Sequence, residues 1–181
     1  MSDELLDLVD EKDQVVGEVW KSKAHKNPSL LHREVAVIIY DGKNRILFQK
    51  RSNNKKINPS IWAESCAGHV PKGMKPLNAA HMELQEELGF DTVLKYYSKT
   101  LAHLPNETHF TYWFIGKYPN KEIKIQREEV DQVKFLSQTQ LKRLVKSGEK
   151  YGPTTYGGHP EDMVEKFWLQ IKSRLNNLSS N

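Results

Sequence analysis

The sequence predicts a single domain of mixed α/β class, with strands in a central sheet and a few helices packed on it. Two observations lead to this prediction. The β-branched apolar run Glu34–Tyr40 and the run Arg45–Lys50 flank an Asp-Gly pair, which is typical of two buried strands joined by a turn. Leucine and alanine then recur at helical spacing over Leu77–Leu88, and Gly89 ends that pattern.

The remaining elements follow the same alternation. Leu5–Val9 and Val15–Val19 indicate a hairpin or a strand-loop-strand unit at the start of the chain. Three further segments have the composition of strands: Val93–Tyr97, His109–Ile115 and Val133–Leu136. Ser137 opens a capping-box pattern for a short helix, and a last helix with an apolar stripe follows Pro160.

Composition restricts the classes of function. Hydrophobic residues make up 38% and charged residues 28% of the chain, which is typical of a globular protein, and the longest apolar stretch, Val35–Tyr40, is too short to cross a membrane. The acidic start is unlike a signal peptide and there is one cysteine, so we expect a cytoplasmic location. A net charge of +4 suits a small anionic ligand and is too mild to indicate nucleic-acid binding. Without a linker-like segment, we expect one domain over 1–175 and a frayed tail over 176–181.

Three glutamates share one face of the helix predicted at Leu77–Leu88. Glu83, Glu86 and Glu87 stand at i, i+3 and i+4, where like charges repel one another and the negative end of the helix dipole adds to the repulsion. Carboxylate oxygens in this arrangement suit Mg²⁺, or Mn²⁺ as a second choice. A solvated acidic helix face is the alternative that the helix alone does not exclude.

The segment from Gly68 to Phe90 resembles the Nudix box, G-x5-E-x7-R-E-U-x-E-E-x-G-U, where U is an aliphatic or aromatic residue. The resemblance implies a Nudix-type α/β/α sandwich with a mixed central sheet. It also implies divalent-metal-dependent hydrolysis of a pyrophosphate bond in a nucleoside diphosphate linked to another moiety. In that family the glutamates matching Glu83, Glu86 and Glu87 bind the metal ions, and a glutamate outside the box often helps. Here the candidates for that fourth group are Glu128 and Glu129.

Two positions depart from the box. Met74 stands where the pattern has its first glutamate, and Met82 stands where it has arginine. In relatives these two residues commonly form an ion pair, and replacing both partners with apolar side chains can be neutral for stability. We therefore expect Met74 and Met82 to touch, with the metal carboxylates retained. The alternative is a weakened active site that serves as a nucleotide-binding or regulatory module.

Residues outside the box resemble the Nudix subgroup that contains isopentenyl-diphosphate isomerase and related hydrolases. By that likeness we expect Arg51 and Lys55 to bind diphosphate, together with Gly68 and His69. The expected ligand is thus a small diphosphate molecule, and a homodimer is left open.

The isomerase itself is the competing interpretation. It needs a cysteine directly before the Gly-His pair, but Ala67 occupies that position, and Cys66, one residue earlier, would face the opposite side of a strand. His109 stands near the position of the isomerase's catalytic glutamate. Cys66 is more simply a small buried hydrophobe. The spacing of His25, His32 and His81 does not indicate a zinc site.

Overall fold

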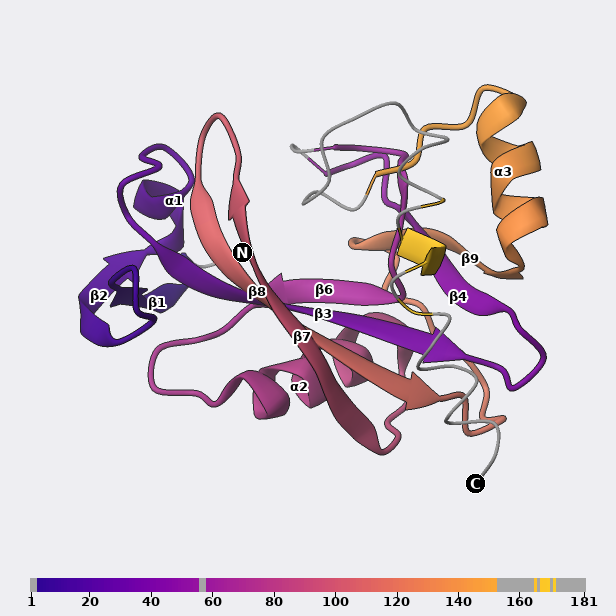
Figure 1. The fold of residues 1–181 in the computed structure, drawn as a ribbon, viewed down its shortest axis with the longest axis horizontal. Coiled ribbons are helices and arrows are strands. Elements are labelled where there is room, and N and C mark those ends of the chain that lie inside the picture. The colour runs from indigo at the N-terminus through magenta and orange to yellow at the C-terminus, as the bar shows by residue number, and fades with distance from the viewer. Residues whose placement is uncertain (1–2, 56–57, 153–164, 166, 170, 172–181) are drawn as a thin grey trace.

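The computed structural model describes residues 3–55, 58–152, 165, 167–169 and 171. Within these residues the strands and helices alternate along the chain (Figure 1). Their bounds are β1 Leu5–Val9, β2 Val15–Trp20, α1 Lys21–Ala24, β3 His32–Tyr40, β4 Ile46–Arg51, β5 Trp62–Ala63, β6 Cys66–His69, α2 Pro76–Leu88, β7 Leu94–His103, β8 Thr108–Lys117, β9 Val130–Leu136 and α3 Gln138–Lys146.

The seven-stranded sheet is mixed. Its strand order is β5-β4-β3-β8-β7, with β6 also paired to β3 and β9 also paired to β4. β3 runs parallel to β8, whereas the other pairings are antiparallel. β1 and β2 form a separate hairpin at one end of the sheet (Figure 1). The prediction of a mixed central sheet is confirmed.

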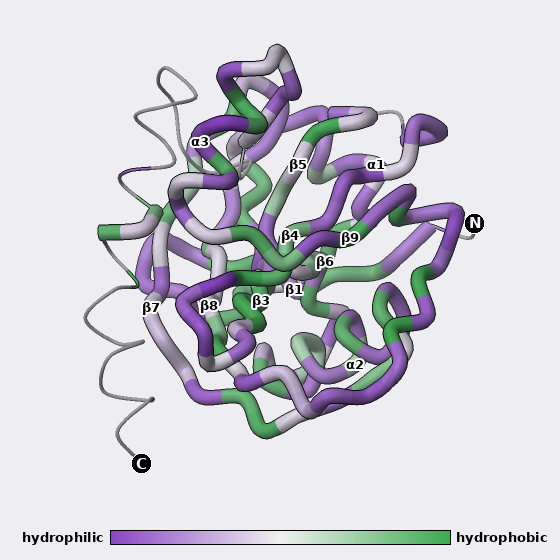
Figure 2. The backbone as a smooth tube through the Cα atoms, turned by 90° about the vertical axis from the view of Figure 1, so that its right-hand side faces the viewer, coloured by the Kyte–Doolittle hydropathy of each residue, from purple (hydrophilic) through white to green (hydrophobic). Residues whose placement is uncertain are grey.

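Side chains of β3 alternate between two hydrophobic layers, which explains its unbroken apolar sequence. Val35 and Val37 pack with Leu84 of α2 on one face, and Ala36 packs with Leu141 of α3 on the other. The second layer also includes three buried helical residues near the C-terminus: Phe167, Trp168 and Ile171. Helices thus cover both faces, and the α/β/α arrangement is confirmed, with hydrophobic segments concentrated in the central strands (Figure 2).

Three features differ from the sequence prediction. The strands β3 and β4 pair only at Tyr40 and Ile46, because β6 occupies the rest of that edge of β3. β7 continues to His103 rather than ending at Tyr97, and its second half escaped detection because this edge strand is largely exposed and polar. β5, β6 and α1 are too short for a periodic signal.

The helix termini follow local rules. Pro76 opens α2, and Gly89 ends it in the left-handed conformation (φ 72°) with its N–H bonded to the Gln85 carbonyl. Ser137 and Gln140 form the predicted capping box of α3. Most of the helix predicted after Pro160, including Met163, Val164 and Leu175 of its stripe, lies outside the described residues.

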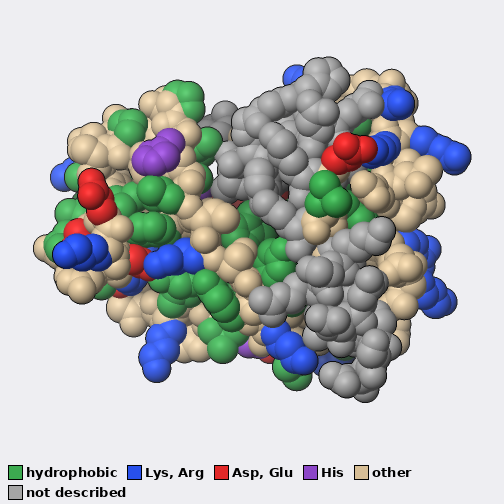
Figure 3. Space-filling model, viewed as in Figure 1, with side chains coloured by type: hydrophobic (Ala, Val, Ile, Leu, Met, Phe, Trp, Pro, Cys, Tyr) green, Lys and Arg blue, Asp and Glu red, His purple; other side chains and the backbone are tan. Residues whose placement is uncertain are grey.

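The described surface shows no concentrated charge on the face drawn in Figure 3, where the visible Lys and Arg side chains are dispersed. Among the described helices, none has the length and apolarity that crossing a membrane requires. Neither observation tests the expected location, which stays a prediction, as do the single domain over 1–175 and the tail.

Candidate active site and metal centre

The carboxylate of Glu83 lies directly against the backbone of β6. A Cβ added at Gly68 would be 2.5 Å from Glu83 Oε2 and closer still to Cδ and Oε1. Gly68 thus leaves the space that this carboxylate occupies. Burial, followed by the negative charge of Glu86, raises the pKa of Glu83 to about 7.

Glu87 is the most buried of the three helix glutamates, with 4% of its surface exposed. Gln49 of β4 donates a hydrogen bond from Nε2 to Glu87 Oε2 at 3.0 Å. Burial and the charge of Glu83 raise the pKa of Glu87 well above its usual value. Glu86 is exposed at the same end of α2. The helix thus gathers carboxylates that carry a desolvation cost unless a cation compensates them.

The structure distinguishes the two candidates for a fourth carboxylate. Glu129 is partly buried, and its negative charge contributes to the raised pKa of both Glu83 and Glu87, after burial and the nearer glutamates. It forms an ion pair with Lys55. Glu128 is exposed and faces none of these groups in the described contacts. Of the two, Glu129 is placed to act with α2.

Arg51 ends β4 close to several buried carboxyls. Its positive charge opposes the effect of burial on the pKa of Glu34, Glu64 and Glu87. Lys55 lies on the loop that follows, beside Glu129. Arg51 thus lies near Glu87 of α2 and Lys55 pairs with Glu129, and the binding of diphosphate by these two residues stays a prediction.

Met74 packs against the hydrophobic layer that lies between α2 and the sheet. Met82 is partly buried on α2. Replacement of the ion pair by apolar side chains is thus consistent with the surroundings of Met74. Direct contact between the two methionines stays a prediction.

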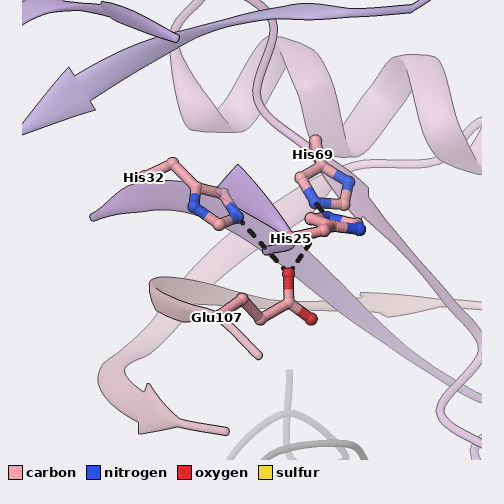
Figure 4. Close-up of side chains that lie close together, drawn as sticks. All are labelled: His25, His32, His69 and Glu107. Atoms are coloured by element: carbon pink, nitrogen blue, oxygen red, sulfur yellow. Dashed lines mark hydrogen bonds and ion pairs between the residues drawn. The ribbon is translucent and has the colours of Figure 1, made fainter. Parts of the chain in front are cut away.

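Sequence spacing missed a cluster of histidines beside the carboxylates of α2. The ligand atoms of His25, His32, His69 and Glu107 lie within 4.8 Å of one another. His25 Nε2 is 3.0 Å from Glu107 Oε2 and 2.8 Å from His69 Nε2. Figure 4 shows the three imidazole rings gathered around the Glu107 carboxylate. Because the four residues come from α1's end, β3, β6 and the β7–β8 turn, no local motif joins them.

Two histidines of this cluster, His32 and His69, have the neutral form that binds a metal. Burial lowers the pKa of His32 to about 4 and that of His69 well below its usual value, so both are neutral at pH 7. His32 Nδ1 lies 3.1 Å from the Leu30 carbonyl oxygen. Because this oxygen can only accept a hydrogen bond, Nδ1 carries the proton and Nε2 has a lone pair that faces the cluster. Burial acts to raise the pKa of Glu107, but the close contact with His25 keeps this pKa below its usual value. Imidazole and carboxylate donors of this kind suit zinc, manganese or iron.

His81, in contrast, belongs to neither group of carboxylates and histidines. Its Nδ1 lies 2.6 Å from Asp91 Oδ1, and both side chains are partly exposed. Sequence spacing gave no reason to group His25 with His32, and the structure brings these two together while His81 lies apart from them.

Cys66 and Ala67 face opposite sides of β6, as the strand period predicts. Cys66 is buried in the layer with α2, and Ala67 packs on the other layer. Burial, followed by the charges of Glu87 and Glu83, raises the pKa of the Cys66 thiol well above its ordinary value. A thiol that is buried and protonated behaves as a small hydrophobe.

The two groups of site residues adjoin each other across the end of β6. Gly68 borders Glu83, and the next residue, His69, belongs to the histidine cluster. The positive charge of Lys21 acts on the pKa of both Glu83 and Glu34, against the larger effect of burial. One anionic ligand at this edge could therefore approach both groups.

Comparisons with known proteins agree with this geometry. The NUDIX domain model matches residues 30–155. The isopentenyl-diphosphate Delta-isomerase 2 of Photorhabdus laumondii is 36% identical over 148 residues, which are 79% of this chain and 82% of that protein. An uncharacterized Nudix hydrolase of Listeria monocytogenes is 33% identical over 144 residues, covering 79% of this chain and 85% of that protein. A crystal structure from Deinococcus radiodurans superposes with a TM-score of 0.71 at 20% identity, over 90% of this chain and 98% of that one. The chain therefore belongs to the Nudix domain family.

Proposed function

We propose that this protein hydrolyses the pyrophosphate bond of a nucleoside diphosphate linked to another moiety, with Mg²⁺, or Mn²⁺ in its place. The main support is a pair of carboxyls on α2, of which Glu87 is buried and Glu83 is half-buried. Glu83 is fitted against Gly68 and Glu87 is held by Gln49, at a cost in desolvation that a divalent cation would offset.

The proposed metal residues are Glu83, Glu86 and Glu87, with Glu129 as the fourth carboxylate. A magnesium ion bound there supplies charge neutralisation at phosphate oxygens and lowers the pKa of nearby water. The protein's part is to orient its carboxylates before substrate arrives. Gly68 fixes the position of Glu83, and the amide of Gln49 fixes that of Glu87.

Proton transfer and substrate binding involve side chains at the same edge of the sheet. We assign proton acceptance to Glu86 or Glu87, and Glu86, being exposed, is the easier one for water to reach. Arg51 and Lys55 would bind the diphosphate, which requires Lys55 to exchange its ion pair with Glu129 for the phosphate. Gly68 and His69 would line the same position.

The isomerase is the second candidate, and the identity to the Photorhabdus isomerase favours it. Its chemistry requires groups that donate and remove protons on opposite faces of an alkene. Ala67 cannot take a proton, and the Cys66 thiol is buried on the side of the sheet that faces α2. This arrangement supports hydrolysis over isomerisation.

A substrate panel tests the proposal. Mg²⁺-dependent phosphate release is measured with ADP-ribose, UDP-glucose, diadenosine polyphosphate, nucleoside triphosphates and isopentenyl diphosphate, and isomerisation of the last is followed separately. We expect turnover of at least one nucleotide and no isomerisation. Binding without turnover would instead indicate the regulatory module.

A variant pair links turnover to α2. Glu86→Gln should reduce kcat by two or more orders of magnitude and leave the unfolding midpoint nearly unchanged, because the residue is exposed. Glu122→Gln, at an exposed glutamate whose partner is Lys124, is the matched control and should keep full activity. Normal turnover by Glu86→Gln would remove this carboxylate from the site.

A further inference from the structure

The loop of residues 70–75 connects the two parts of the α2 site. It leaves β6 and enters α2, so it joins Gly68 to the helix that carries Glu83. The start of the helix has little local support, because Lys75 at the N-cap makes no side-chain hydrogen bond and the first turn holds no acidic residue. The position of Glu83 against Gly68 therefore depends on what holds this loop.

The hairpin of β1 and β2 is bonded to the loop through two successive backbone N–H groups. The N–H of Lys72 donates to the Leu5 carbonyl at 2.8 Å. The N–H of Gly73 donates to both carboxylate oxygens of Asp7, at 3.2 Å and 3.1 Å. Gly73 has a φ of 74°, which glycine adopts without strain. The loop is thus bonded to β1 by one carbonyl and one carboxylate.

The pairing of β1 with β2 places a second carboxylate beside Asp7. Asp7 and Glu18 are opposite each other in the register, so their side chains lie on the same face of the hairpin, where like charges are destabilising. Both carboxylates contact the loop. Asp7 accepts the N–H of Gly73, and Glu18 forms an ion pair with Lys72. The loop therefore supplies a compensating donor for each of the two charges.

Asp7 is the buried member of this pair, and the sheet fixes its side chain. It is 7% exposed, whereas Glu18 is exposed. Asp7 Oδ2 lies 3.7 Å from Arg33 Nη1, and Arg33 donates from Nε to Asp13 Oδ1 at 2.6 Å. The Arg33 carbonyl accepts the N–H of Val70, the first residue of the loop, at 3.0 Å. Arg33 thus fixes the start of the loop and the carboxylate of Asp7 together.

Contacts of the loop with α2 are of a different kind. Among the described contacts, the side-chain hydrogen bonds and ion pairs of the loop lead to the hairpin, and none leads to a side chain of α2. Met74 in the loop and Met82 in the helix cannot form an ion pair, and Met74 packs in the hydrophobic layer instead. Because apolar packing is non-directional, the backbone position of the loop is set by the hairpin.

We propose that Asp7 is a positioning residue for the metal carboxylates of α2. By accepting the N–H of Gly73, it fixes the loop that leads into the helix, and the loop in turn sets the separation of Gly68 and Glu83. This assignment rests on the metal site of the proposed function and adds to it a residue that acts through the loop. Loss of the bond matters because a displacement of about 1 Å is enough to disturb metal binding and catalysis.

Three variants test the role of Asp7. Asp7→Ala removes the acceptor, and Asp7→Asn keeps an oxygen that can accept from Gly73 but loses the charge. Asp10→Ala is the matched control, because Asp10 accepts the N–H groups of Lys12 and Gln14 within the same hairpin and makes no described contact with the loop. Mg²⁺, which prefers oxygen ligands to imidazole, is titrated by calorimetry, and protection of the Gly73 amide is measured by hydrogen exchange.

We expect Asp7→Ala to weaken Mg²⁺ binding by about tenfold or more and to lower the protection of Gly73 by a similar factor. Asp7→Asn should retain most of both properties, and Asp10→Ala should match the unmodified chain. Equal losses in Asp7→Asn and Asp7→Ala would assign the effect to the ion pair with Arg33 and overturn the proposal. Unchanged Mg²⁺ affinity in folded Asp7→Ala would overturn it as well.

These measurements do not depend on turnover. If the unmodified chain binds Mg²⁺ but hydrolyses no nucleotide, the proposed function fails, whereas titration and exchange still decide the role of Asp7. A chain that binds no Mg²⁺ would overturn both. Should Asp7→Ala fail to fold, the unmodified chain and Asp7→Asn decide. Rapid exchange of the Gly73 amide in the unmodified chain, or loss of Mg²⁺ binding in folded Asp7→Asn, would then contradict the proposal.

Discussion

Replacement of Gly68 by alanine tests the position of the Glu83 carboxylate more directly than any change to Glu83 itself. The new Cβ would lie 2.5 Å or less from the carboxylate atoms, whereas an ordinary carbon–oxygen contact is about 3.4 Å. The carboxylate must therefore move by about 1 Å or more. Gly68 lies in a strand without a positive φ, so alanine itself fits the backbone.

A shift of this size matters because Mg²⁺ tolerates little variation. Its bonds to oxygen are about 2.1 Å and acceptable deviations are about 0.2 Å. Displacement of a catalytic group by about 1 Å can cost about a hundredfold in rate. We therefore expect Gly68→Ala to lower kcat/KM by about a hundredfold and to raise the Mg²⁺ concentration needed for half-maximal rate.

Gly17→Ala is the matched control, since its added Cβ would make only ordinary contacts with Leu8 at 3.7 Å or more. Both variants are assayed for Mg²⁺-dependent hydrolysis of the best substrate, and both are melted to confirm folding. Glu83→Asp, which shortens the side chain, should partly restore the activity of Gly68→Ala. Full activity in folded Gly68→Ala would refute the role assigned to Glu83.

Three further predictions rest on other buried groups. Burial raises the pKa of Glu64 to about 7 from 4.5, so the folded chain binds a proton that the unfolded chain has lost, and this stabilising contribution disappears as pH rises from 4.5 through 7. Measured in urea with EDTA, Glu64→Gln should gain stability over the unmodified chain between pH 5 and 8, by at most about 3 kcal/mol, and a constant difference would contradict the shift. Cys66→Ala should keep hydrolysis within about twofold while losing about 1 kcal/mol of stability, and a large loss of turnover would make the thiol part of the site. Met74→Glu should lower the free energy of unfolding by about 1–3 kcal/mol and added Met82→Arg should recover part of it, whereas additive effects in the double-mutant cycle would argue against contact.

The grouping of carboxylates on α2 was largely predictable because these residues are close in sequence. Helical periodicity places Glu83, Glu86 and Glu87 on one face, and this geometry is local. The stop at Gly89 and the cap at Ser137 are likewise set by neighbouring residues, and both are present in the structure. What the helix pattern alone left undecided was whether the carboxylates are solvated or buried.

The histidine cluster was not predictable, because its members come from separate elements. His32, His69 and His109 meet only through the pairing of β6 and β8 with β3, and His25 joins them from the end of α1. Register between distant strands depends on which residues become buried together, and single-chain spacing carries little of that information.

The sequence by itself determined the family, the mixed α/β class and the carboxylates of α2, since each of these depends on residues within a few turns or strands of one another. Only the tertiary structure decided that Glu83 is fitted against Gly68, that Cys66 lies in the layer with α2, and that a second group of side chains able to hold a metal ion comes together. The physical reason is that desolvation and the convergence of distant side chains arise only when strands pair and helices cover them.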